Sequence, residues 1–146
     1  MTRSTARQMR AWTGPALLTY GFRPFFLGAA LWALVAMLIW VPVVTGALDL
    51  PSAFDPVTWH AHEFLFGYLG AVIAGFLLTA VPNWTGRLPI VGGRLGLLAL
   101  VWIAGRIAIA FSARIPAIAV AAVDLAFPLL LALAIGREIV AGKNWR

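Results

Sequence analysis

The sequence predicts an all-α, polytopic membrane protein whose four transmembrane helices form two antiparallel hairpins. Of its 146 residues, 62% are apolar and only 11% are charged, whereas charged residues make up about a quarter of a soluble domain. The apolar residues fall in four long runs, and the basic residues gather at the ends of these runs. The net charge of +6 therefore indicates orientation in a membrane, not binding to nucleic acid.

The first predicted span covers residues 24–48, which carry no charge. This length exceeds the roughly 20 residues that a helix needs to cross a bilayer. It also exceeds the apolar core of a signal peptide, which has about 7–15 residues. We therefore expect a retained membrane span. The chain has no cysteine, so disulfides and thiolate metal sites are excluded.

The second predicted span covers residues 56–82. Asp55 suits the position that caps a helix N-terminus, and Pro56 suits the first helical position. His60, His62 and Glu63 would then lie in the first turns of this helix.

The third and fourth predicted spans cover residues 95–113 and 115–136. Arg106 interrupts the third run and Asp124 interrupts the fourth. The connection between them is too short for anything but an antiparallel hairpin, and Pro116 suits the start of the last helix. The other loops are also short, so we expect residues 1–146 to form a single transmembrane domain.

The distribution of lysine and arginine predicts that both termini are cytoplasmic, because cytoplasmic loops are enriched in these residues. Arg114 is alone on one side of the predicted membrane. The opposite side holds Arg3, Arg7, Arg10, Arg23, Arg87, Arg94, Arg137, Lys143 and Arg146.

Ionisable residues at membrane depth are costly and need an explanation. At about 1.5 Å of rise per residue, His60, Glu63, Arg106 and Asp124 fall in one layer near the outer side. One interpretation is a structural ion pair between Arg106 and Asp124. The other is a functional cavity, in which Pro128 frees the carbonyl of Asp124 because proline has no N–H to donate.

The two histidines are candidate metal ligands, since neutral imidazole binds metals and is a usual axial ligand of haem. On a regular helix His60 and Glu63 share a face, whereas His62 points almost the opposite way. A single metal ion would then not be held by both histidines. Small residues that would allow close approach of another helix or of a flat ligand continue the face of His60: Gly67, Ala71 and Gly75. The alternative is that the histidines are only polar residues at a helix start.

Several motifs together resemble the NnrS family, membrane proteins that contain haem and copper and are associated with the bacterial response to nitric oxide. The resemblance begins at about residue 20 and runs to the last residue. The motifs are Tyr-Gly-Phe-Arg-Pro-Phe-Phe at 20–26, Trp-His-Ala-His-Glu at 59–63, the block from Gly75 to Arg87, Ala-Gly-Arg at 104–106, Asp-Leu-Ala-Phe at 124–127 and Asn-Trp-Arg at 144–146.

The resemblance implies an inner-membrane protein of nitric-oxide tolerance. It implies haem and copper as cofactors, with His60 and His62 as cofactor-binding and metal-ligating candidates. Glu63, Arg106 and Asp124 would support these ligands or pair with one another.

Members of this family are considerably longer, so we expect a truncated copy whose partners are absent helices or further copies of itself. Two alternatives remain open: a transporter or channel module with a polar outer vestibule, and a fragment without function. No catalytic motif is recognised, which leaves enzymatic activity undecided.

Overall fold

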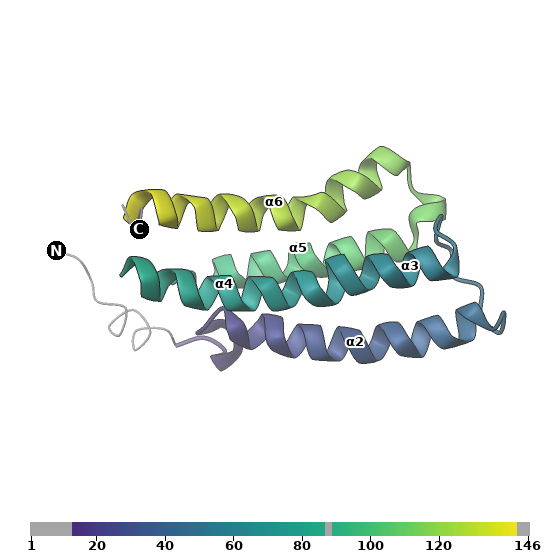
Figure 1. The fold of residues 1–146 in the computed structure, drawn as a ribbon, viewed down its shortest axis with the longest axis horizontal. Helices are drawn as coiled ribbons and strands as arrows, with labels where there is room; N and C mark the ends of the chain where they lie inside the picture. Colours follow the sequence, from purple (N-terminus) through teal and green to yellow (C-terminus); the bar gives the residue numbers. More distant parts are fainter. Residues whose placement is uncertain (1–12, 87–88, 143–146) are drawn as a thin grey trace.

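A computed structural model describes residues 13–86 and 89–142, and every element within these ranges is helical. Four rod-like segments lie side by side (Figure 1). In chain order the elements are η1 (Ala16–Leu18), α2 (Phe22–Val44), α3 (Pro56–His62), η2 (Glu63–Leu69), α4 (Gly70–Thr85), α5 (Gly93–Ala110), η3 (Ser112–Arg114) and α6 (Ala117–Gly142). The continuous helix formed by α3, η2 and α4 is called the second span below.

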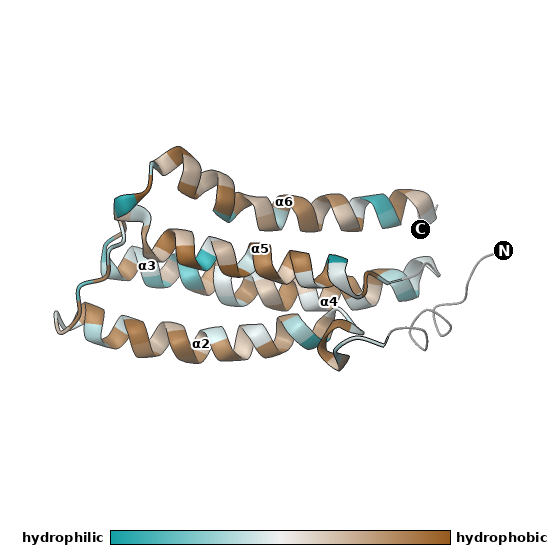
Figure 2. Ribbon diagram, turned by 180° about the vertical axis from the view of Figure 1, so that it is seen from behind, coloured by the Kyte–Doolittle hydropathy of each residue, from teal (hydrophilic) through white to brown (hydrophobic). Residues whose placement is uncertain are grey.

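In the part of the chain that the structure describes, four helices are long and apolar enough to cross a membrane: 22–44, 56–85, 93–110 and 117–142. The predicted spans are therefore found as helices, although their bounds differ: the first helix ends at Val44 and not at residue 48, the third ends before residue 113, and the last continues past residue 136. Hydrophobic residues dominate the length of each helix (Figure 2). Many large apolar side chains on these helices are exposed, as expected of surfaces that face lipid.

The helices pack mainly in consecutive order. The second span packs against α2 and also contacts α6, while α5 packs against α6. Successive long helices run in opposite directions (Figure 1). Hydrogen bonds join the loop that precedes α3 to the segment that follows α5. Ala53 N–H donates to Ser112 Oγ at 2.8 Å, and Ala113 N–H donates to the Pro51 carbonyl at 3.1 Å.

The start of the second span agrees with the sequence prediction. The carboxylate of Asp55 accepts hydrogen bonds from the N–H groups of Val57 at 3.0 Å and Thr58 at 3.1 Å, and Pro56 occupies the first helical turn. Hydrogen bonds from the Thr58 side chain and backbone lower the pKa of Asp55 from 3.8. A charged cap therefore fixes where this helix begins.

The buried apolar side chains form two clusters, and a charged layer separates them. Three helices each place one charged residue between the clusters. On the second span Glu63 lies between Trp59 and Ala71; on α5 Arg106 lies between Trp102 and Ala108; on α6 Asp124 lies between Val120 and Phe127. The layer thus interrupts an otherwise apolar interior at one level.

Candidate functional site

Four ionisable side chains form a closed ring of contacts in this layer, which we call the charged ring: His62, Glu63, Arg106 and Asp124. Arg106 Nη1 donates to Glu63 Oε2 at 3.0 Å, and Nη2 donates to Asp124 Oδ1. His62 Nδ1 lies 3.3 Å from Glu63 Oε1, and Nε2 lies 3.2 Å from Asp124 Oδ2. Each carboxylate therefore bridges the guanidinium group and the imidazole.

The charged ring is buried almost completely. Glu63 is 0% exposed, Arg106 3% and Asp124 4%, while the His62 side chain is 15% exposed. Charges removed from water are tolerated when they are paired and hydrogen bonded. The predicted ion pair between Arg106 and Asp124 is confirmed, and so is the alternative in which Glu63 is a partner of Arg106.

Close helix packing brings the ring together. A Cβ atom added at Gly105 would lie 3.2 Å from Asp124 Oδ1 and 3.4 Å from Asp124 Cα, so glycine allows α5 to approach α6 at this level.

Pro128 lies within α6, and because it has no N–H it leaves the carbonyl four residues earlier without its helical donor. The first half of α6 bends away from the axis of the rest (Figure 1), which is the usual effect of an internal proline.

The second span is not a regular α-helix beside the ring, although its irregular part begins only after the two histidines. Residues Glu63–Leu69 form a π-helix, in which Gly70 N–H reaches back to the Leu65 carbonyl. Such a wide turn disturbs the normal hydrogen-bond ladder. The indole N–H of Trp102 on α5 donates to the Gly67 carbonyl at 3.0 Å, so a side chain from a neighbouring helix supports the irregular turn.

The small-residue face meets α2, as predicted. A Cβ atom added at Gly67 would lie 2.4 Å from Trp32 Nε1, and one added at Gly75 would lie 2.7 Å from the ring of Phe26. Ala71 between them is fully buried. Close approach of two helices therefore depends on this face.

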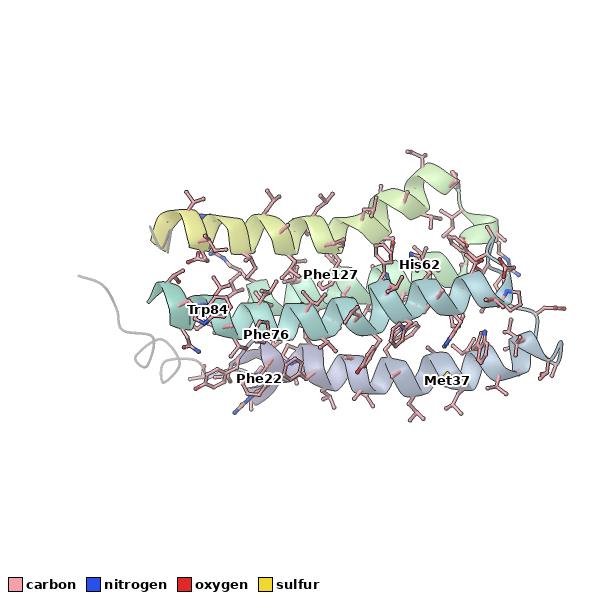
Figure 3. All side chains as sticks on the ribbon, in the orientation of Figure 1. Phe22, Met37, His62, Phe76, Trp84 and Phe127 are labelled. Carbon is pink, nitrogen blue, oxygen red and sulfur yellow. The ribbon has the colours of Figure 1, made fainter. Side chains whose placement is uncertain are left out.

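The two histidines contact different helices, which confirms that they are not equivalent. The His60 ring stacks on Trp40 of α2, with centroids 4.4 Å apart and planes inclined by 25°. The His62 ring stacks on Phe66, with centroids 4.6 Å apart and planes inclined by 8°, and lies between the second span and α6 (Figure 3). On a regular helix Glu63 would share a face with His60, but in the structure it is His62 that contacts Glu63.

His60 is suited to a metal or to haem in this arrangement, whereas His62 is not. His60 Nδ1 is buried and has no hydrogen-bond partner within the described ranges. Both ring nitrogens of His62 instead face carboxylate oxygens, so neither offers a free lone pair. Across residues 13–86 and 89–142, no three histidine, aspartate or glutamate side chains are grouped to hold a metal ion. The described residues therefore fit a single imidazole ligand and not a complete metal cage.

A comparison with known families matches residues 16–146 to the family described as NnrS protein. No curated protein and no solved structure matches the chain. The matched region covers most of the chain and includes both histidines and the whole charged ring. Together with four helices suited to crossing a membrane, this match shows that the chain is a membrane protein that belongs to the NnrS family.

Proposed function

We propose that this chain is a multi-pass protein of the bacterial inner membrane that binds haem or copper and takes part in the response to nitric oxide and the tolerance of nitrosative stress. The family match supports this role. The structural observation that carries it is His60, whose Nδ1 is buried and has no partner among residues 13–86 and 89–142, although buried polar atoms in proteins are normally hydrogen bonded.

His60 would hold the haem iron or the copper ion as a single imidazole ligand. When bound, the metal would supply an open coordination position at which a diatomic gas can bind. Trp40, stacked on His60, restricts rotation of the imidazole. The indole N–H of Trp40 donates to the Pro56 carbonyl at 3.0 Å, so the stacking partner is itself held against the start of the second span.

The charged ring would act as the support of this ligand and not as a second metal centre. Its contacts attach the second span to α5 and α6 immediately after His60. A ligand imidazole is effective when the surrounding shell fixes its helix and its orientation.

Both termini would face the cytoplasm, as the basic residues indicate. Of these residues, Arg3, Arg7, Arg10, Arg87, Lys143 and Arg146 lie outside the described residues, whereas Arg23, Arg94 and Arg137 lie near helix ends.

The test is the haem and copper content per purified chain, together with its visible absorption spectrum. We expect His60→Ala to lose the bound group while its thermal unfolding midpoint stays close to that of the unaltered chain. His62→Ala should lower the midpoint more strongly, because two buried carboxylates then lose a partner. An unaltered chain without haem or copper would contradict the proposal, and the transporter or channel alternative would take its place.

A further inference from the structure

An apolar cavity of about 310 Å³ lies beside the charged ring, between the second span and α6. This volume is at the lower end of the range of roughly 300–1,000 Å³ that is usual for small-molecule sites. Leu65, Phe66 and Ile73 line it from the second span, and Phe127 and Leu131 line it from α6. Phe127 points into the space between these two helices (Figure 3).

The cavity is long and has one polar end. On α6 its lining extends from Asp124 to Ile135, a rise of about 16 Å along the helix. Arg106 and Asp124 line the polar end, and the other lining residues are apolar or glycine. The shape and polarity therefore suit an elongated molecule with a polar head and an apolar tail.

The polar end offers one unused hydrogen-bond donor. Arg106 is 3% exposed, and its two terminal nitrogens are taken by Glu63 and Asp124. Its remaining nitrogen, Nε, is buried and has no partner among the described residues. A buried N–H without an acceptor is costly, so an acceptor on a molecule in the cavity would stabilise it.

The charge of the ring selects the kind of head group. Asp124 lines the cavity, and Glu63 lies on the other side of the same guanidinium group. These two carboxylates outnumber the one guanidinium group, and Asp124 itself lines the cavity, so an anionic head such as a fatty acid carboxylate or a phosphate would be repelled there. A neutral head with a carbonyl acceptor avoids this repulsion and still accepts from Nε.

We propose that this cavity binds a neutral lipophilic carbonyl compound of the quinone class, with one carbonyl oxygen on Arg106 Nε and the alkyl tail along α6 toward Ile135. The proposal concerns binding only. It is independent of haem or copper at His60, because neither histidine lines the cavity.

The experiment uses the full chain in lipid nanodiscs and a decyl-substituted benzoquinone that carries a photoreactive azide. After illumination, labelled peptides are mapped by mass spectrometry, with and without an excess of unlabelled decylbenzoquinone. We expect labels on residues 65–77 and 124–135 that the unlabelled quinone removes and that dodecanoate, a carboxylate with a similar tail, does not remove.

Two variants separate the cavity from the general lipid surface. Ala132 lines the cavity, whereas its neighbour Leu133, which is 69% exposed, does not. Ala132→Trp should fill the cavity and weaken competable labelling by about tenfold, since overpacking a site costs of the order of 1–3 kcal/mol. The control Leu133→Trp should label like the unaltered chain. Equal labelling of the two variants, or equal competition by dodecanoate, would overturn the proposal.

Discussion

At the scale of single residues, each member of the charged ring has two partners. Arg106 holds both carboxylates, and His62 contacts the same two carboxylates from the other side. Removing any one member leaves two buried groups with an unused donor or acceptor. The loss of one charge should therefore cost more than the loss of an isolated surface ion pair, which is about 0–1 kcal/mol.

The first prediction concerns the Arg106–Asp124 pair. Asp124→Asn should destabilise the protein by about 3–5 kcal/mol, the usual cost of breaking a buried ion pair, and should lower the thermal midpoint and the yield in membranes. Arg106→Gln combined with Asp124→Asn should recover part of the loss. Recovery should be more complete when Glu63→Gln is added, because Glu63 otherwise stays buried without its guanidinium partner. A double variant that loses as much as the two single variants together would show that the residues are not coupled.

The second prediction concerns Gly67, where α2 approaches the π-helix. A Cβ atom there would lie 2.4 Å from Trp32 Nε1 and 3.0 Å from Glu63 Oε2, so Gly67→Ala must displace the tryptophan or the ring. We expect a loss of about 1–3 kcal/mol, measured as a lower midpoint of thermal unfolding. Gly136→Ala is the matched control, since a Cβ atom on that helical glycine meets nothing within 4 Å. Equal midpoints for the two variants would contradict the close packing.

At the scale of elements, the π-helix at residues 63–69 is the feature that sequence patterns did not predict. Helix bounds follow from local signals, and Asp55 with Pro56 marked the start of the second span correctly. A π-helix depends on what neighbouring helices offer to its carbonyl groups, which here includes the Trp102 indole. Such a partner is 35 residues away in sequence, so a local reading cannot find it.

The third prediction tests this support. Trp102→Phe keeps an aromatic ring but removes the donor to the Gly67 carbonyl. The Gly67 carbonyl would then be buried without a donor, which should lower the stability of the protein by about 1–3 kcal/mol. This loss should be seen as a lower thermal midpoint and faster amide exchange in residues 63–70. Unchanged exchange in this segment would mean that the π-helix does not depend on Trp102.

The contrast between local sequence signals and contacts with neighbouring helices also explains which parts of the site the sequence could predict. The shared depth of Glu63, Arg106 and Asp124 follows from counting residues along straight helices, and the pair of Arg106 with Asp124 follows from their opposite charges. The role of His62 did not follow, because face assignments on a single helix do not say which neighbour packs on each side. His60 faces α2 and His62 faces α6, and only the packing of the bundle decides which of them joins the carboxylates.

At the scale of the whole molecule, the fourth prediction concerns orientation. The basic residues predict that the loops at residues 45–55 and 111–116 lie outside the cytoplasm, and the structure joins these two loops at one end of the bundle. Reporter fusions after Asp55 and Ser112 should report the periplasm, and fusions after Arg94 and Arg146 the cytoplasm. A periplasmic signal after Arg94 would reverse the orientation.

The charged ring also bears on how the chain is inserted during synthesis. The charges of its two carboxylates and its guanidinium group alternate along the polypeptide: Glu63 emerges first of the three, then Arg106, then Asp124. A lone charge in a nascent membrane helix carries an insertion cost of about 2.5–3.5 kcal/mol. Each helix inserted after the second span therefore carries a charge opposite to that of the helix inserted before it. The order of synthesis therefore shortens the time during which a charge in the membrane has no partner, because each new helix supplies the opposite charge.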